Sequence, residues 1–390
     1  MLLEAAGNAQ DAGLLAEAED LCRQLLELES TRSEAPLKAS ALNLLSKVMD
    51  SMGRNPEALI LAEEALEVSE RDGDPTAVVR ELSNLTGALL FAHQPTRAKP
   101  LALRVVSMLT ELGMSRELGS ALGTLANCFQ QLERFDESLE TYHAAIASLR
   151  AAGNKRSEGI THSNLGALLV SKGALAEAAQ SLEQALKLHR ETGNRRSEGV
   201  ALGNYGNVLF DERQYEKSLA TYQQALAIHR EVGNRRSEGL VLGSLGNTLL
   251  QLGRLDEAEN CIVTALAIHR DLRNRRSEGV ALGDLAEVRS RRGDPQRAAL
   301  LLREALLCDV EAQNRRHEGL HLCALGLLEL NLLGRATANN TWQRGIALLR
   351  AATGGTDYPN RVEAMRATCH LAGVAPFELP SELAAPDGKP

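Results

Sequence analysis

The chain has 390 residues, of which 24% are charged and only 3% are aromatic, and its formal net charge is −8. So few aromatic residues argue against the usual core of an α/β enzyme, whereas the abundance of leucine, alanine, glutamate and arginine favours an all-helical chain. The negative charge argues against a molecule built to hold nucleic acid or an anionic membrane.

The six cysteines and the ends of the chain bear on cellular location. The cysteines include no CxxC pair, so we expect buried thiols in a reducing compartment and neither a disulfide nor a zinc framework. The first residues lack the basic segment of a signal peptide. No run approaches the ~18–20 apolar residues of a membrane span. We therefore expect a cytoplasmic protein without membrane insertion.

A 40-residue repeat governs the sequence. The heptapeptide GNRRSEG occupies residues 193–199 and 233–239, and variants of it occupy 153–159, 273–279 and 313–319. A Leu-Gly-like pair recurs at the same interval, for example at 165–166 and 245–246, and small residues follow at two fixed places. Such self-similarity is the signature of a repeat architecture.

Each period predicts two helices. In the central repeat the first helix is expected over about 195–211 and the second over about 215–232, because Leu202, Tyr205 and Leu209 recur at helical spacing. A single helix pair cannot cover its own apolar face, so neighbouring pairs must stack. At the far end, Pro359 suits the first turn of a helix that caps the stack.

Domain boundaries follow from this pattern. We predict a repeat array over 1–352, a cap helix within 353–374 and a flexible tail over 375–390. The first repeat begins inside its own first helix, which leaves two alternatives: the array needs no more, or the chain is the C-terminal piece of a larger protein.

The Leu-Gly pair, followed by alanine twelve and nineteen residues later with a larger residue between, resembles the tetratricopeptide repeat (TPR). The 40-residue version is similar to repeats of LGN/Pins-type adaptors and to TPR arrays of bacterial signalling proteins. The resemblance implies an all-α, right-handed α-solenoid of about nine helix-turn-helix units with a C-terminal cap helix. It also implies a concave groove, lined by first helices, that binds a peptide or a helical segment of a partner protein.

The GNRRSEG motif is predicted to form the joint between successive repeats. Gly193 suits the left-handed residue that ends a helix, Asn194 the N-cap of the next, and Glu198 its first turn. The arginine doublets either pair with glutamates of the repeat or face acidic groups on a partner. We expect one arginine of each doublet to pair and the other, by the resemblance the first, to contact the partner.

A polar ladder is expected on the first helices, opposite their core side. In the resembling adaptors the matching asparagines and the turn arginine contact the partner peptide. The carried-over and neighbouring ladder positions predicted to bind a partner are Asn127, Gln131, Asn164, Arg195, Asn204, Asn207, Asp211, Arg235, Asn247, Gln251 and Arg275. The alternative is that the asparagines hydrogen-bond to neighbouring helices and brace the stack.

Candidate chemistry is confined to one motif. His317 and His321 with Glu318 form a literal HExxH, the zinc-binding pattern of zincins. Glu318 is the repeat's own glutamate, however, and no third ligand has a recognisable spacing. We predict no catalytic residue, no metal and no cofactor, with a zinc hydrolase at His317 and His321 as a remote alternative. His189, His229 and His269 are expected to be packed and hydrogen-bonded.

The function predicted from these features is a non-enzymatic protein–protein interaction scaffold that binds no nucleic acid. The alternative is a sensor or regulatory arm of a multidomain bacterial signalling protein, such as a kinase, a nucleotide-binding ATPase or a transcription regulator.

Overall fold

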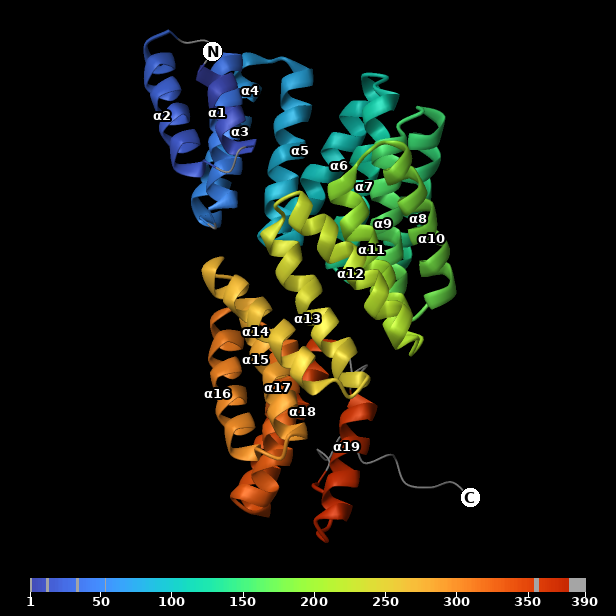
Figure 1. Ribbon diagram of the computed structural model, residues 1–390. Helices are drawn as coiled ribbons and strands as arrows, with labels where there is room; N and C mark the ends of the chain where they lie inside the picture. Colours follow the sequence, from blue (N-terminus) through green and yellow to red (C-terminus); the bar gives the residue numbers. More distant parts are fainter. Residues whose placement is uncertain (1, 12–13, 33–34, 53, 354–357, 379–390) are drawn as a thin grey trace. The chain divides into compact units, whose positions relative to one another are not determined.

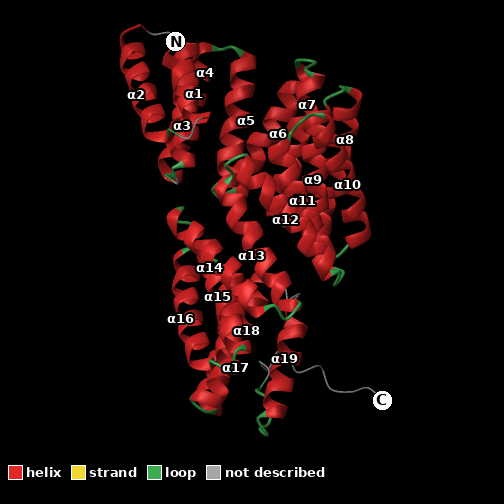
Figure 2. Cartoon of the chain, viewed as in Figure 1, coloured by secondary structure: helices red, strands yellow, loops and turns green. Residues whose placement is uncertain are grey.

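The computed structural model describes residues 2–11, 14–32, 35–52, 54–353 and 358–378. These residues form nineteen α-helices. Figure 2 shows helices and loops and no strand among the described residues, so the all-α prediction is confirmed. The first helices of nine successive pairs are α1 (Leu2–Asp11), α3 (Ala35–Ser51), α5 (Pro75–Phe91), α7 (Ser115–Gln131), α9 (Lys155–Ser171), α11 (Arg195–Asp211), α13 (Arg235–Gln251), α15 (Arg275–Arg291) and α17 (Arg315–Leu332). The second helices are α2 (Leu15–Arg32), α4 (Asn55–Asp72), α6 (Pro95–Glu111), α8 (Phe135–Ala151), α10 (Leu175–Glu191), α12 (Tyr215–Glu231), α14 (Leu255–Asp271), α16 (Pro295–Glu311) and α18 (Arg335–Thr353). A single helix, α19 (Tyr358–Leu371), follows.

The chain divides into two compact units, residues 1–208 and 209–390, with the boundary inside α11 (Figure 1). Within each unit a first helix touches the next first helix, as α7 touches α9 and α13 touches α15. Among the described helices of either unit, no second helix touches another second helix. Elements on the inner side of a curved stack lie closer together than those outside, so the first helices form the inner face of each unit.

Each repeat is held by a close approach between its own two helices. A Cβ atom on Gly166 would lie 2.5 Å from Leu182 Cγ, and one on Gly246 would lie 2.5 Å from Ile262 Cγ1. Both large residues are fully buried, as are the small residues Ala178 and Ala258 at the start of the second helices. The glycine and alanine places read from the sequence are therefore the contact points of the helix pairs.

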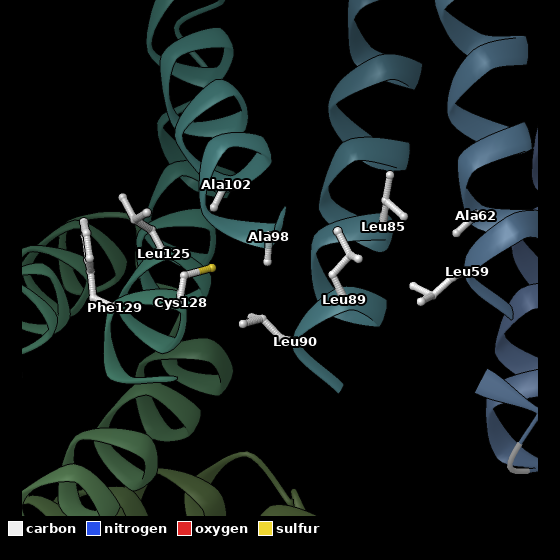
Figure 3. Close-up of a cluster of buried hydrophobic side chains, with 10 residues drawn as sticks. All are labelled: Leu59, Ala62, Leu85, Leu89, Leu90, Ala98, Ala102, Leu125, Cys128 and Phe129. Atoms are coloured by element: carbon white, nitrogen blue, oxygen red, sulfur yellow. The ribbon is translucent and has the colours of Figure 1, made fainter. Parts of the chain in front are cut away.

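The cores of successive repeats merge. Figure 3 shows one cluster that joins Leu59 of α4, Leu89 of α5, Ala98 of α6 and Phe129 of α7, which belong to three successive repeats. Burying the apolar face of each pair against its neighbours is the stabilisation that a single pair lacks.

The C-terminal end is packed further than expected. The cap helix predicted in 353–374 is present as α19, which buries Met365 and Cys369. Phe377 is only 3% exposed, and its ring centroid lies 5.9 Å from that of Trp342. Residues 375–378 thus pack against the last repeat although the sequence assigned them to a tail. Residues 379–390 of that predicted tail lie outside the described part of the chain.

The close approach at Gly246 predicts that alanine substitutions at Gly246 and at Gly243 have different effects on stability. We expect Gly246→Ala to lower the free energy of unfolding by roughly 1–3 kcal/mol, because the added Cβ overlaps the Ile262 side chain. Gly243, three residues earlier on α13, has open space where its Cβ would be. Gly243→Ala should be neutral or stabilising by about 0.5–1 kcal/mol, the helix-propensity gain. Urea denaturation followed by circular dichroism measures both, and equal effects would contradict the contact.

Candidate functional site

The joints between repeats have the geometry expected of the GNRRSEG motif. Gly193 and Gly233 adopt left-handed φ angles of 63° and 64°. The Asn154 and Asn234 side chains accept hydrogen bonds from the backbone N–H groups of Ser157 and Ser237, at 3.2 and 3.3 Å. The glycine therefore ends one helix and the asparagine caps the next, as predicted.

The motif glutamate is clamped by two arginines. Arg190 Nε donates to Oε1 of Glu198 at 2.9 Å, and Arg195 Nη1 donates to Oε2 at 2.7 Å. The next repeats repeat the arrangement, with Arg230 and Arg235 on Glu238, and Arg270 and Arg275 on Glu278. These glutamates are buried. Burial alone raises the pKa of Glu198 and Glu238, but the arginine hydrogen bonds outweigh it and hold each pKa below the ordinary value.

One half of the clamp was missed from the sequence. The arginine eight residues before the glutamate lies near the end of the preceding second helix, and it recurs as Arg150, Arg190, Arg230 and Arg270. Its recurrence every 40 residues is visible in the sequence, but the sequence does not show that it pairs with the motif glutamate. It joins each second helix to the first helix of the following repeat.

The pairing within the arginine doublets differs from the expectation. The first arginine, such as Arg235, is the one that pairs with the glutamate, because a spacing of three residues places it over the carboxylate. The second, such as Arg236, is exposed and lies four residues before Leu240, on the same stripe of the helix as the predicted ladder. The expectation that the second arginine, and not the first, pairs with the motif glutamate is therefore wrong.

Several ladder residues brace the stack. Asn127 accepts hydrogen bonds from the Tyr142 hydroxyl and, at 3.4 Å, from the Asn164 amide of the next first helix. Gln131 donates to the Leu90 carbonyl of the previous first helix at 3.1 Å. In residues 209–390, Asn247 of α13 hydrogen-bonds to Asp284 of α15.

The remaining ladder positions are placed differently. Asn204 is half-buried and has no hydrogen-bond partner among the described residues. Asn207 is half-buried and makes contacts of its own, whereas Asp211 and Gln251 are exposed at the ends of their helices. The unit boundary divides the predicted set: Asn127 to Asn207 belong to the first unit, and Asp211 to Arg275 belong to the second.

The second-helix histidines are packed, as predicted, but the predicted hydrogen bonding is met only in part, because the buried Nδ1 atoms of His189 and His269 have no hydrogen-bond partner among the described residues. His189 is fully buried, and its Nε2 lies 3.1 Å from Ser163 Oγ. Its ring occupies the space that a Cβ on Gly159 would fill, and His269 does the same at Gly239. Burial lowers the pKa of His189 and His269, which keeps both rings neutral.

In the HExxH motif, His321 and Glu318 make contacts at the joint between the last two repeats. Asp309 occupies the place that His269 has one repeat earlier, and His321 Nδ1 lies 2.7 Å from Asp309 Oδ2. The imidazole fills the space beside Gly283, where a Cβ would lie 2.2 Å from its Nε2. Glu318 accepts a hydrogen bond from Arg315 at 3.1 Å. Among the described residues no group of three or more His, Cys, Asp or Glu is placed to hold a metal ion.

A family model described as tetratricopeptide repeat matches residues 117–191, 197–271 and 237–306, and a second model of that description matches 39–71. The chain belongs to the TPR family. Comparison with curated proteins gives no match. No helix in the described part of this TPR protein is long and apolar enough to cross a membrane.

Solved structures share the fold of this TPR array. A Rap protein complexed with competence and sporulation factor is 16% identical with a TM-score of 0.64, and the match covers 87% of this chain and 93% of that one. The apo form of RapI is 12% identical with a TM-score of 0.60, covering 86% and 92%. A signal transduction ATPase with numerous domains (STAND) from Pyrococcus horikoshii is 15% identical with a TM-score of 0.60, covering 88% of this chain and half, 50%, of that one.

The pairing of each motif glutamate with one or two arginines predicts unequal losses of stability when the glutamate is replaced in two different repeats. We expect Glu238→Gln to lower the free energy of unfolding by about 1–2 kcal/mol, because two charged hydrogen bonds are lost from a buried site. Glu318→Gln should cost about half as much, since Val310 stands where Arg270 stands one repeat earlier and, among the described residues, Arg315 alone bonds to the Glu318 carboxylate. Thermal melting of the two variants checks this, and an equal loss would contradict the two-arginine clamp.

Asp284 predicts a pH-dependent effect. Burial raises its pKa to about 6 from a model-peptide value near 4, so the folded state binds its proton more tightly than the unfolded state. The ionised form therefore costs stability above pH 6, and the cost disappears as pH falls below about 4. Asp284→Asn should stabilise the protein by about 1 kcal/mol at pH 7.5 and by little at pH 4. Melting curves at both pH values measure this, and a pH-independent difference would contradict it.

Proposed function

We propose that the protein is a non-enzymatic scaffold that binds a peptide or helical segment of a partner protein on the inner face of its first helices. The observation that carries this proposal is that first helices of each unit leave aliphatic side chains exposed. In the first unit Ile160 and Val200 are 41% and 40% exposed, and in the second unit, taken by itself, Leu240 is 49% exposed. They recur at the repeat interval and at the same place in each first helix, which isolated surface residues do not.

The inner face also offers polar groups at regular places. The half-buried Asn204 follows Val200 by one helical turn and has an amide with both a donor and an acceptor. Such a group can hydrogen-bond to the backbone of a bound segment without requiring a particular side chain. Asn127 and Asn164 act differently in the proposal, since their mutual hydrogen bond holds neighbouring first helices in register.

The comparisons support a protein or peptide partner. A Rap protein of the same fold forms a complex with competence and sporulation factor. The HExxH motif supports no competing enzymatic proposal, because His321 is bound to Asp309 and Glu318 to Arg315. With a net charge of −8, nucleic acid is not the partner we propose, and the scaffold needs no cofactor.

A second candidate is a sensor or regulatory arm of a multidomain signalling protein. The likeness to a STAND protein with a TPR sensor, half of whose length the match spans, favours it. In that case binding on the same inner face would control an effector domain. Both candidates therefore share the binding step, and they differ only in what the bound state controls.

The binding step is testable without a known partner. Peptides selected from a random display library against the whole protein should lose affinity about three- to tenfold on Val200→Ser combined with Asn204→Ala, both in the first unit, measured by fluorescence anisotropy. The melting temperature should hardly change. Gln184→Ala, an exposed change on α10, is the matched control and should leave affinity unaltered. Failure of the library to yield any binder, or binders indifferent to the inner-face changes, would sink the proposal.

A further inference from the structure

The residues from Ala375 to Glu378 form an extended strap beside α18. Arg335 donates to the Ala375 carbonyl at 3.4 Å and to the Pro376 carbonyl at 3.1 Å. Further along the helix, the Gln343 amide donates to the Glu378 carbonyl. The eight helical residues between these contacts rise about 12 Å, and three extended residues span about 10 Å. The strap therefore runs along one side of α18 in the direction of the helix.

A single side chain anchors the strap. Phe377 is 3% exposed and packs against Trp342, whereas the other residues of the strap are exposed. The last repeat thus holds the strap through one aromatic side chain and through backbone carbonyls, which every residue type offers. A peptide bound to a receptor surface makes contacts of the same kind, in which the backbone supplies affinity and a pocket selects the side chain.

Two buried polar groups next to the strap have no hydrogen-bond partner among the described residues. They are the indole N–H of Trp342 and the side-chain oxygen of Asn339. Asn339 follows Arg335 by four residues and precedes Gln343 by four, so it lies on the stripe of α18 along which the strap runs. A buried donor and a buried acceptor left unpaired both cost free energy. The strap therefore fills this site without satisfying its polar groups.

The sequence of the strap accounts for the unused acceptor. Pro376 has no backbone N–H, and the N–H of Phe377 donates to the Met365 sulfur, a weak acceptor, at 3.1 Å. Neither residue at the centre of the strap donates to Asn339. A peptide with an ordinary residue before its aromatic one brings the missing N–H.

We propose that this stripe of α18 and the pocket around Trp342 form a peptide site, which the strap covers until an extended segment of a partner protein displaces it. The ligand has an aromatic side chain, which takes the place of Phe377, directly after a residue other than proline. Its carbonyls meet the same side chains as those of the strap, and Asn339 accepts the N–H that Pro376 lacks. The site uses a second helix and so goes beyond the function proposed for the first helices.

Displacement of the strap is measured on the whole protein through Trp342, its single tryptophan. Phe377→Ala should shift the tryptophan emission to longer wavelength, because water reaches the indole, and an added Val-Ala-Pro-Phe-Glu peptide should reverse the shift. The peptide should bind this variant at least about tenfold more tightly than the unsubstituted protein, since the strap no longer competes. Leu371→Ala, which removes a side chain that is 88% exposed, is the matched control and should change neither readout.

A milder variant guards against loss of folding. Phe377→Leu keeps an apolar side chain against Trp342 and should raise the affinity for the peptide about threefold. Melting temperatures show that each variant is folded.

The donor before the aromatic residue is tested with a pair of peptides on the Phe377→Ala variant. Val-Ala-Ala-Phe-Glu should bind at least about threefold more tightly than the same peptide with N-methylalanine before phenylalanine, because only the first has an N–H for Asn339. Asn339→Ala should abolish the difference between the two peptides. Equal affinities on the unsubstituted asparagine would remove the assigned ligand chemistry.

A permanent structural cap gives a different result. Phe377→Ala would then expose Trp342 and lower the melting temperature, but no peptide would bind, and the inference would be overturned. Equal binding of a peptide without phenylalanine would also overturn it, as would weaker binding on Val200→Ser with Asn204→Ala, which would assign the peptide to the first helices. If those two inner-face changes leave library-selected peptides unaffected, the proposed function fails and the site on α18 stands.

Discussion

The close contact between the two helices of each repeat is the constraint on which the rest of this structure depends. Where the first helix has glycine, the second helix can place a whole side chain against its backbone, as His189 does at Gly159. That contact fixes the end of α10, and Arg190, the residue after His189, then reaches Glu198 at the start of α11. The packing within one repeat thereby sets the joint to the next. Steric contact decides the position, and the charged hydrogen bonds stabilise it.

The eighth repeat shows how the same constraint is met with different chemistry. Asp309 stands in the place of the histidine, and Val310 in the place of the clamp arginine, so the usual link from second helix to first helix is lost. His321 supplies another by pairing with Asp309 beside Gly283. A buried carboxylate requires such a partner, because an unpaired one would cost several kcal/mol. The motif that resembles a zinc site is thus explained by packing and by the hydrogen bond between His321 and Asp309.

The sequence predicted the fold well because its signals are local. Helix spacing, the glycine and asparagine of each joint and the fixed small residues need only residues close along the chain, and nine pairs with a final helix follow from the period. The site was harder to predict. Arg190 lies across a turn from Glu198, so no helical spacing relates them, and the division of each arginine doublet depends on where that glutamate points. The hydrogen bond between Asn127 and Asn164 could not be predicted without knowing the distance between repeats. The burial of Phe377 could not be predicted without knowing where Trp342 lies.

These contacts also restrict what the inner face can recognise. The first arginines are held by glutamates, and Asn127, Asn164 and Asn247 are engaged in bonds between neighbouring first helices. The exposed aliphatic side chains and Asn204 are not used in this way. If the protein binds a partner segment as we propose, Ile160, Val200 and Asn204 of the first unit can contact that segment without breaking a bond that holds neighbouring first helices together.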